Sequence, residues 1–299
     1  MVEMHAGEAR TDADLVRRLL RAQFPRWADL AVRRLDSGGT VNAIYRVGTE
    51  LTVRLPLIEH GTHGLWREAK WLPVLAPHLP TPIPTVVGIG EPGEGYPWAW
   101  SVHRWLEGEV LVEDHVTAPE ELARDLAAFV TAMRAIDAPG GPTAYRGAPL
   151  ATADAEARPA IEALRRTDEP FDTGAVVAAW ETALAAPPWA GRPCWTHSDL
   201  MPSNLLVDVH GRLAAVLDFS TAGIGDPAAD LIPAWNLLPA SARRVFRDHV
   251  DVDDDTWARG RGWALSMAII QLPYYRHTNK VISANARHTL TQVLADPGS

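Results

Sequence analysis

The spacing of apolar residues divides the chain into two regions of different character. Residues 12–27 repeat apolar positions at helical spacing, with an aspartate able to cap the start. Residues 30–56 instead hold short β-type runs, NAIYRV and ELTVRL, separated by Gly-rich or polar turns, which predicts antiparallel hairpins. Residues 64–79 return to helical spacing, and residues 83–106 return to strand spacing. The first third is therefore predicted to be a small antiparallel sheet with one main inserted helix.

From about Val112 onward, Ala-, Leu- and Arg-rich stretches of helical spacing dominate the chain. The predicted helices cover residues 119–136, 152–165, 172–186, 226–248 and 255–276. Among them, LLVDVHGRLAAVLDF (205–219) predicts two short strands around a turn, and the Pro- and Gly-rich segment 138–150 is predicted to be a connector. We therefore expect an α+β protein of two lobes, with a β-rich domain at residues 1–104 and a larger, mostly helical domain at residues 105–299.

The composition narrows the classes of partner. The 299 residues carry 28 basic and 37 acidic side chains, a net charge of −9, which argues against nucleic acid and favours cationic or neutral small molecules. The single cysteine, Cys194, excludes a disulfide framework and a cluster of thiolate ligands. The polar start of the chain lacks an apolar signal segment, and the apolar stretch 263–275 is too short to span a membrane. We therefore expect a cytoplasmic protein without a membrane partner.

Polar residues interrupt an apolar stretch at His197, Asp199 and Asn204, in the pattern H-x-D-x-x-x-x-N. Asp218 follows at the end of the next apolar run. Phosphoryl transfer uses such a set, because one carboxylate receives the proton of the attacking hydroxyl while an amide oxygen and a second carboxylate hold Mg²⁺. The pattern predicts Asp199 as the base and Asn204 and Asp218 as magnesium ligands. The alternative is a buried hairpin whose polar residues only complete its turns.

The first third contains groups that a nucleotide site would need. Ser37, Gly38 and Gly39 stand at a predicted hairpin tip, where backbone N–H groups can approach phosphate oxygens. Arg54, in the middle of the next predicted strand, could clamp the α- and β-phosphates, and Glu68 on the following helix could hold that cation. An ordinary glycine turn and a pair of surface charges are the structural alternatives.

These motifs resemble those of the aminoglycoside phosphotransferase family, small-molecule kinases with a protein-kinase-like bilobal fold. The resemblance runs from about Leu30 to the C-terminus, and its most specific parts are HSDLMPSNLLV, VLDFSTAGIGDPAADL and WSVHRWLEGEV. It implies a nucleotide-binding N-terminal lobe. It also implies a helical C-terminal lobe that carries the catalytic base and the substrate site.

The resemblance assigns the base and both magnesium ligands to the same residues as the pattern does. It makes Glu68 the partner of the strand cation and places backbone groups from Arg104 to Leu106 at the hinge that receives the purine. Two positions depart from the family pattern, because Arg54 stands where lysine is expected and Ser198 stands where glycine is more usual. Arginine stays charged and can bind phosphate in a bidentate manner, but its planar head is not equivalent to an ammonium group.

A protein kinase is not predicted, although its motifs are related. Protein kinases need a long activation segment after the metal-binding aspartate. Here Asp218 is followed almost at once by a GDP turn, in which Asp226 resembles an N-cap and Pro227 the first helical residue. No segment remains for a peptide platform, so a small acceptor is favoured.

Several other motifs have simpler explanations. GIGEPG (88–93) matches a dinucleotide fingerprint but continues into a Pro-rich segment rather than a helix, which predicts a hairpin turn. GIGDPA (223–228) opens a helix without a following βαβ unit, and neither lysine follows a glycine, which excludes a Walker A loop. DVDDDTW (251–257) lacks the glycine and glutamate of a calcium loop and is predicted to be an Asp-rich helix start. A contribution of this segment to a cationic-substrate pocket stays open.

We predict an O-phosphotransferase that moves the γ-phosphate of ATP or GTP to a hydroxyl group of a small molecule, with Mg²⁺ as cofactor. An antibiotic-modifying kinase for an aminoglycoside or another hydroxylated, cationic acceptor is the leading hypothesis. The alternatives are a metabolic kinase for an amino alcohol, a sugar or a similar metabolite, and a nucleotide-binding pseudokinase, which Arg54 alone suggests.

Overall fold

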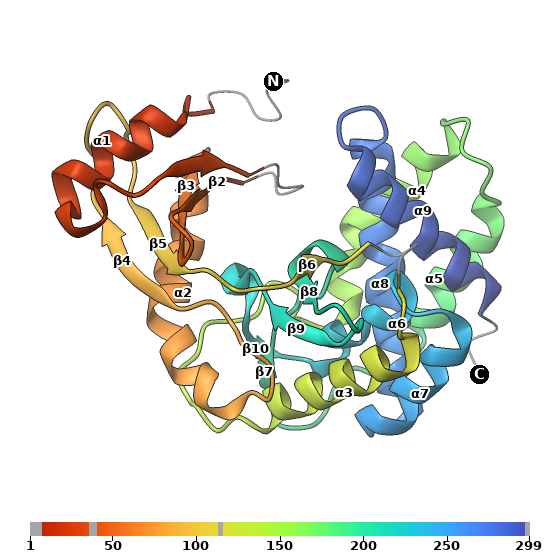
Figure 1. Cartoon of the computed structure of the whole chain (residues 1–299). Coiled ribbons are helices and arrows are strands. Elements are labelled where there is room, and N and C mark those ends of the chain that lie inside the picture. Colours follow the sequence, from red (N-terminus) through yellow and green to blue (C-terminus); the bar gives the residue numbers. More distant parts are fainter. Residues whose placement is uncertain (1–7, 36–40, 113–115, 297–299) are drawn as a thin grey trace. The chain divides into compact units, whose positions relative to one another are not determined.

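The computed structural model describes residues 8–35, 41–112 and 116–296 (Figure 1). The chain forms two compact units. Unit 1 contains Met1–Pro77, Pro82–Glu107 and Ala215–Ser220, and unit 2 contains His78–Thr81, Gly108–Ala214 and Thr221–Ser299. The predicted boundary between residues 104 and 105 stays a prediction. The observed units add a short late segment, with Asp218 in it, to the N-terminal unit.

Unit 1 is built on an antiparallel sheet of five strands in the order β1-β2-β3-β5-β4. Asp12 caps the first helix, because its Oδ1 accepts the Leu15 N–H at 2.7 Å. The elements of unit 1 are α1 (Ala13–Gln23), β1 (Val32–Arg34), β2 (Asn42–Val47), β3 (Leu51–Pro56), α2 (Gly61–Leu75), β4 (Val86–Gly90) and β5 (Trp100–Arg104). The predicted small sheet with one main inserted helix, α2, is confirmed.

The two faces of this sheet differ in chemistry, because successive strand residues point to opposite sides. Tyr45, Val53 and Val102 are fully buried in a hydrophobic core that includes the apolar side of α1. Arg54 lies on the opposite face, next to Ser101 of β5 in the strand register. Burial of the first face fixes the register, since a slip of one residue would expose the core. The polar face is thereby held in place for chemistry.

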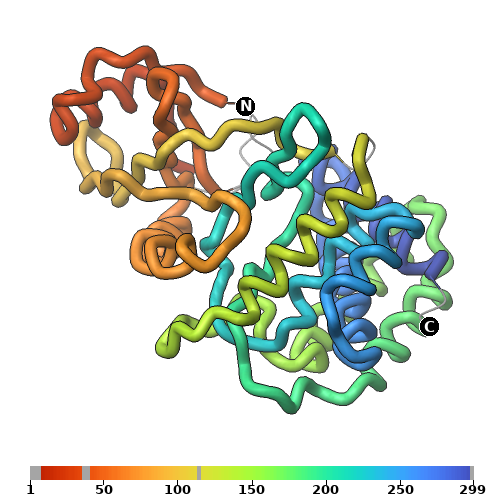
Figure 2. The backbone as a smooth tube through the Cα atoms, turned by 60° about the horizontal axis from the view of Figure 1, so that its bottom comes forward, coloured from red at the N-terminus to blue at the C-terminus, as the bar shows by residue number. Residues whose placement is uncertain are grey.

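Unit 2 is mostly helical. Its helices are α3 (Pro119–Ala135), α4 (Asp154–Arg165), α5 (Thr173–Leu184), α6 (Pro233–Asn236), α7 (Ala240–Val250), α8 (Asp254–Tyr275) and α9 (Lys280–Ala295). Its strands are β6 (Glu109–Val110), β7 (Cys194–Thr196), β8 (Leu205–Val207) and β10 (Gly223–Gly225), together with the first half of β9 (Leu213–Val216), whose last two residues belong to unit 1. Helices α8 and α9 lie side by side, as do α3 and α7 (Figures 1 and 2). Strand β7 pairs with β10, and β9, which leads into the late segment of unit 1, belongs to a second sheet of order β6-β8-β9.

The prediction of one helix over residues 226–248 is wrong. The segment forms a 3₁₀ helix at Pro227–Leu231 and then the separate helices α6 and α7. Pro233 and Pro239 explain these interruptions, because proline lacks the N–H donor and clashes with the preceding turn. The predicted GDP turn is present, since the Asp226 carboxylate accepts the Ala228 N–H at 3.0 Å and Pro227 begins the 3₁₀ helix.

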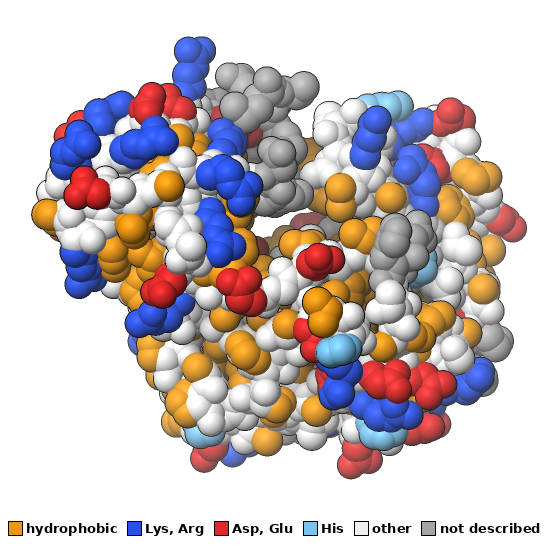
Figure 3. All heavy atoms as spheres, viewed as in Figure 1, with side chains coloured by type: hydrophobic (Ala, Val, Ile, Leu, Met, Phe, Trp, Pro, Cys, Tyr) orange, Lys and Arg blue, Asp and Glu red, His pale blue; other side chains and the backbone are white. Residues whose placement is uncertain are grey.

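Charged side chains of both signs lie next to one another on the surface shown in Figure 3. Among the exposed ion pairs of the described residues, Arg192 contacts Asp137 at 2.6 Å and Arg124 contacts Glu120 at 3.3 Å. Exposed pairs of this kind contribute little to stability. Within the described residues, none of the helices has the length and apolar character that a membrane crossing requires.

Candidate active site

The segment from His197 to Asn204 forms a tight loop between β7 and β8 in unit 2. Met201 N donates to Asp199 O at 2.8 Å, and Asn204 N donates to Met201 O at 2.9 Å. Pro202 opens the single 3₁₀ turn that ends at Asn204, and its fixed φ favours that turn. The sequence therefore folds this segment back on itself, which brings Asn204 to Asp199.

The Asp199 carboxylate is held at both oxygens. Oδ2 accepts from Asn204 Nδ2 at 3.2 Å, and the same Nδ2 donates to Asp199 O at 2.9 Å. Oδ1 accepts from Arg146 Nη1 at 3.0 Å, and Arg146 Nη1 also donates to Ser198 O at 2.8 Å. The Asp199 side chain is still 24% exposed, so an oxygen lone pair can receive a proton from a ligand.

Asp230, which is completely buried, holds the start of the loop. Its two carboxylate oxygens accept the His197 N–H at 2.8 Å and the Ser198 N–H at 2.7 Å. Burial raises the pKa of Asp230, while the N–H donors of His197 and Ser198 oppose that shift. The paired N–H groups replace the water that this carboxylate loses on burial.

Ser198 has a left-handed backbone with φ of 61°, a conformation that favours glycine. Its hydroxyl donates to Thr221 O at 3.0 Å, and the Thr221 hydroxyl donates to His197 O at 2.9 Å. Left-handed residues other than glycine are strained by about 1–2 kcal/mol. The reciprocal hydrogen bonds with Thr221, together with Asp230, keep the loop in this conformation.

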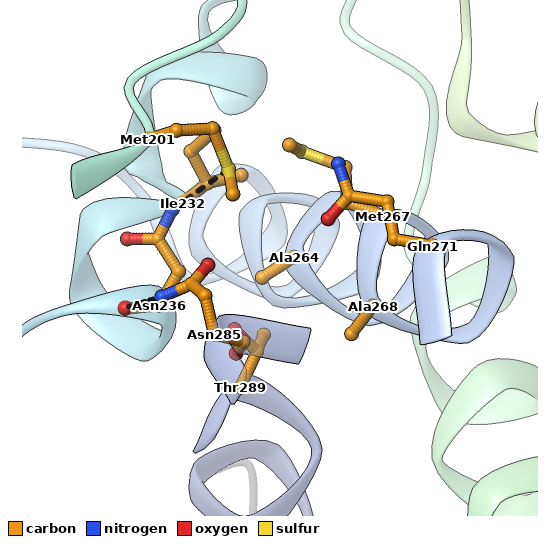
Figure 4. Close-up of a pocket in the computed structure, with 9 residues that line it drawn as sticks. All are labelled: Met201, Ile232, Asn236, Ala264, Met267, Ala268, Gln271, Asn285 and Thr289. Atoms are coloured by element: carbon orange, nitrogen blue, oxygen red, sulfur yellow. Dashed lines mark hydrogen bonds between the residues drawn. The ribbon is translucent and has the colours of Figure 1, made fainter. Parts of the chain in front are cut away.

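Two buried asparagines support the loop from behind. Asn236 Nδ2 donates to Leu200 O at 3.1 Å and contacts Met201 Sδ at 3.4 Å. Asn285 Nδ2 in turn donates to Asn236 O at 2.7 Å. Figure 4 shows these side chains, from α6 and α9, around a small recess that α8 also lines. The backbone next to Asp199 is thus tied to the helices of unit 2.

A second cluster of predicted site residues lies in unit 1. Arg54 of β3 contacts both oxygens of Glu68, on α2, at 3.3 and 3.4 Å. Glu68 Oε1 also accepts the Phe219 N–H at 2.9 Å. The Glu68 side chain is only 5% exposed, so burial raises its pKa, and the positive charge of Arg54 opposes this. The structure therefore joins Arg54 and Glu68 as an ion pair and not as separate surface charges.

Asp218 lies beside this ion pair in unit 1. The negative charge of Asp218 adds to the upward shift of the Glu68 pKa. Its backbone is left-handed, with φ of 61°, and its Oδ1 accepts from the Ser220 hydroxyl at 2.6 Å. Helix α2 approaches this turn so closely that a Cβ on Gly64 would lie 2.6 Å from Ser220 Cβ. The turn thus orients the Asp218 carboxylate through Ser220.

The predicted hinge follows β5. Arg104 N donates to Thr85 O at 2.9 Å, and Trp105 N donates to Glu50 O at 2.7 Å. The backbone N–H groups of Arg104 and Trp105 are therefore already hydrogen-bonded within unit 1. Of the three predicted hinge residues, Leu106 is the one that these two hydrogen bonds do not involve. The predicted phosphate loop at Ser37, Gly38 and Gly39 lies outside the described residues.

His103 and Trp105, which flank Arg104, pack within unit 1. His103 is 1% exposed and contacts the Ser101 hydroxyl at 2.9 Å. Burial, and then the positive charge of Arg54, lowers the pKa of His103 well below its usual value. The Arg46 guanidinium lies over the Trp105 ring, 3.7 Å from its centre. These contacts hold one nitrogen of His103 and the face of the Trp105 ring, whereas His103 Nδ1 and Trp105 Nε1 are buried without a hydrogen-bond partner among the described residues.

The Asp-rich segment 251–257 begins α8. Asp253 is the N-cap, and its Oδ1 accepts the Thr256 N–H at 2.6 Å. The α8 residues that line the recess beside the loop begin at Ala264, nine residues after Asp255, which is about 14 Å along a helix. These aspartates therefore cap a helix and do not line that recess.

The donor chemistry of Asn204 and Asp218 fits Mg²⁺. Both side-chain hydrogen bonds of Asn204 are donated by Nδ2, so its Oδ1 can face a cation. Asp218 uses Oδ1 toward Ser220, which leaves Oδ2 for the same purpose. Among the described residues, no three His, Cys, Asp or Glu side chains group to hold a metal. Magnesium commonly takes one or two protein oxygens and completes its shell with water and phosphate.

Comparison with known proteins places this chain in a family. The model of the phosphotransferase enzyme family matches residues 32–263. The chain belongs to this family. A stretch of 76 residues is also 30% identical to the uncharacterized protein YcbJ of Bacillus subtilis (strain 168). That match covers 25% of this chain and 23% of YcbJ, so the chain spans less than a quarter of that relative.

Solved structures of similar phosphotransferases share the fold. The GDP complex of wild-type aminoglycoside 2'-phosphotransferase-IIIa is 20% identical, with a TM-score of 0.72 over 95% of this chain and 99% of the other. Macrolide 2'-phosphotransferase MphH from Brachybacterium faecium is 22% identical, with a TM-score of 0.61 over 96% of this chain and 99% of the other. At these identities the likeness shows the fold alone. The predicted fold class and family resemblance are confirmed.

Residues that hold the loop of this phosphotransferase, Arg146, Asp230 and Asn236 among them, were not predicted from the sequence. Arg146 lies in a segment interpreted as a connector, Asp230 in one interpreted as an apolar helix start, and Asn236 in the same predicted helix. Asp230 carried a usable signal, because an aspartate between Ala229 and Leu231 must be paired when it is buried. Arg146 carried none, since an arginine in a Gly-rich connector is usually solvated.

Proposed function

We propose that this phosphotransferase transfers the γ-phosphoryl group of ATP or GTP to a hydroxyl group of a small molecule. The observation that carries the proposal is the state of Asp199: its carboxylate is fixed at both oxygens by Asn204 and Arg146, yet it remains partly exposed. A general base needs this combination, because it must be oriented and still reach the proton of the acceptor.

In the proposed reaction, the acceptor oxygen attacks the γ-phosphorus in line with the departing nucleoside diphosphate. Asp199 receives the hydroxyl proton as the new O–P bond forms and the bond to the diphosphate breaks. Asn204 Oδ1 and Asp218 Oδ2 would hold Mg²⁺, which neutralises negative charge on the phosphates when it is bound. No covalent enzyme intermediate is needed, since the hydroxyl can attack directly.

The nucleotide is assigned to groups of unit 1. Arg54 would contact the α- and β-phosphates, and the ion pair with Glu68 fixes where its guanidinium lies. Leu106 would offer backbone groups to the purine, because the N–H groups of Arg104 and Trp105 are already bonded. The phosphate loop at residues 37–39 completes this proposal. Complexes with GDP or ADP among the similar phosphotransferases support a nucleotide donor.

For the acceptor, we propose an antibiotic with a free hydroxyl group. Similar structures include one described as a GDP and kanamycin complex, one described as a gentamicin complex, and macrolide 2'-phosphotransferases. An aminoglycoside-type acceptor agrees with the net charge of −9. The Asp-rich start of α8 gives no support to a cationic pocket, so the charge argument rests on the whole chain.

The test is a coupled assay of nucleotide turnover with ATP and with GTP, in the presence of Mg²⁺. The acceptors are kanamycin, gentamicin, a macrolide, amino alcohols and sugars, and the Asp199→Asn variant is the blank. The proposal predicts acceptor-dependent turnover by the wild type, turnover at least about a hundredfold lower in the variant, and a product heavier by one phosphoryl group. Turnover with metabolites alone would favour the metabolic kinase. Nucleotide binding without any turnover would favour the pseudokinase.

A further inference from the structure

The loop from His197 to Asn204 contains no lysine or arginine. In the proposed reaction the Asp199 carboxylate acts as a base beside the negatively charged triphosphate, and its own loop has no cation to offset that charge. The structure supplies one cation to it from elsewhere in the chain, because Arg146 Nη1 lies 3.0 Å from Asp199 Oδ1. The Arg146 side chain is 15% exposed, so solvent screens this pair less than it screens a surface pair.

Arg146 is presented by a segment that backbone hydrogen bonds hold firmly against β10. Residues 142–147 form the middle of the predicted connector 138–150, and the name connector is kept for them from here on. They exchange hydrogen bonds with the stretch around Ile224. Ile224 N donates to Pro142 O at 2.8 Å, and Ala144 N donates to Ile224 O at 3.1 Å. Tyr145 N donates to Thr221 O at 3.1 Å, the same carbonyl that accepts the Ser198 hydroxyl. The connector and the loop therefore share an anchoring group.

The connector can approach β10 this closely because Gly223 and Gly225 of β10 have no side chain. A Cβ on Gly223 would lie 2.4 Å from Pro142 O, and a Cβ on Gly225 would lie 2.2 Å from Gly147 Cα. Real Cβ atoms do not come so near to a backbone, so each position requires glycine while the connector keeps its path. The Tyr145 ring lies beside Arg146, 4.8 Å from its guanidinium carbon, and further restricts that side chain.

We propose that Arg146 is the positioning residue of the catalytic base. Its guanidinium fixes one carboxylate oxygen of Asp199, while Asn204 fixes the other, so that the acceptor hydroxyl meets a carboxylate in one orientation. The second hydrogen bond, to Ser198 O, ties the same guanidinium to the left-handed residue before the base. This inference rests on the proposed role of Asp199 as the base.

The test uses Mg²⁺-dependent hydrolysis of ATP and GTP with water as acceptor, so it does not depend on knowing the natural acceptor. Arg146→Ala is expected to lower kcat by roughly a hundredfold, the effect of a misplaced reacting group. The nucleotide KM should stay within about threefold of the wild-type value, because this interaction serves the transition state rather than nucleotide binding. Guanidinium ion added at millimolar concentration should restore part of kcat.

Arg261→Ala is the matched control. Arg261 is also a buried arginine of unit 2 that donates to backbone carbonyls, but these are Val293 O at 2.7 Å and Asp296 O at 2.8 Å, in and after α9, and neither Asp199 nor Asp230 is among its hydrogen-bond partners. This variant should lower the melting temperature, keep kcat, and gain nothing from guanidinium. If Arg146→Ala fails to fold, Arg146→Lys provides the measurement, with kcat expected to fall less than for the alanine variant and the nucleotide KM unchanged.

A double-mutant cycle with Asp199→Asn separates positioning from general support of the fold. If Arg146 acts through Asp199, its removal in the Asp199→Asn background should change the residual turnover by less than about threefold. An equal loss of turnover in both backgrounds, or an Arg146→Ala enzyme as fast as the wild type, would overturn the inference. Should Asp199→Asn itself keep full turnover, the proposed function fails at the base, which is a different result.

Discussion

Unit 1 and unit 2 each contain an arginine–carboxylate pair, and the two pairs are built differently. In unit 1, Glu68 is buried and is shared between Arg54, at 3.3 Å, and the Phe219 N–H. In unit 2, Asp199 is the more exposed partner, at 24%, and Arg146 lies 3.0 Å away. In the unit 1 pair, a backbone group therefore holds the carboxylate, through the Phe219 N–H. In the unit 2 pair, a backbone group holds the arginine, through Ser198 O.

This difference indicates which member of each pair does the chemistry. A group that reacts must reach its substrate, whereas a group that orients another can be buried and fully bonded. By this criterion we propose Arg54 as the working group of its pair, with Glu68 orienting it. In the second pair we propose that Asp199 works and Arg146 orients it. The guanidinium is the proposed working group in unit 1 and the carboxylate in unit 2, because the arginine is the more exposed partner in unit 1 and the carboxylate is the more exposed partner in unit 2.

The largest effect should come from removing the working member of the unit 2 pair. Asp199→Ala is expected to lower kcat by about 10²–10⁴-fold, several kcal/mol of transition-state stabilisation. Nucleotide binding should persist, because it is assigned to unit 1. Steady-state kinetics and nucleotide titration by fluorescence measure the two properties separately. Near-normal turnover would remove the assignment of the base.

Removing the orienting member of the unit 1 pair should have a smaller and mixed effect. Glu68→Gln keeps an oxygen for the Phe219 N–H but loses the charge that holds Arg54. We expect the nucleotide KM to rise and kcat to fall, each by about tenfold, the scale of a hydrogen bond to a charged group. Glu162→Gln, which disrupts an exposed pair with Arg165, is the control and should change neither. An unchanged Glu68→Gln enzyme would make this pair structural.

Backbone strain in the unit 2 loop should have an effect of about 1 kcal/mol on stability. Ser198→Gly and Ser198→Ala both lose the hydroxyl bond to Thr221 O, but only alanine keeps the strain of the left-handed backbone. The glycine variant should therefore be more stable than the alanine variant by about 1 kcal/mol in urea unfolding. The same pair of changes at Ser241, which is exposed on α7, should give the opposite order.

The smallest expected signal concerns the thiol that precedes the unit 2 loop. Burial raises the pKa of Cys194 to about 11, so the thiol stays protonated at neutral pH. Alkylation by iodoacetamide should be slow at neutral pH in the folded enzyme and should accelerate as the pH rises toward 11, because the thiolate is the nucleophile. Urea-unfolded protein is the control and should react faster at neutral pH. Equal rates would show a thiol that is not protected.

The sequence predicted the fold class and the apolar framework of unit 1, because alternation and turn residues act locally. It also suggested that Glu68 of the following helix could hold Arg54, and the family resemblance agreed with that pairing. The single helix over residues 226–248 was wrong because two prolines inside it outweighed the helical spacing. Arg146 and Asp230 were missed because their partners lie far away in the sequence, at Asp199 and at the His197 backbone. Long-range hydrogen bonds leave no periodic trace.

The glycines that face the connector also limit how this enzyme can be re-engineered. The connector backbone lies so close to Gly223 and Gly225 that neither position has room for a side chain. A connector transplanted from a relative would therefore collide with β10 unless that strand were exchanged with it. Any re-engineering of the segment that carries Arg146 should therefore exchange the connector and β10 together.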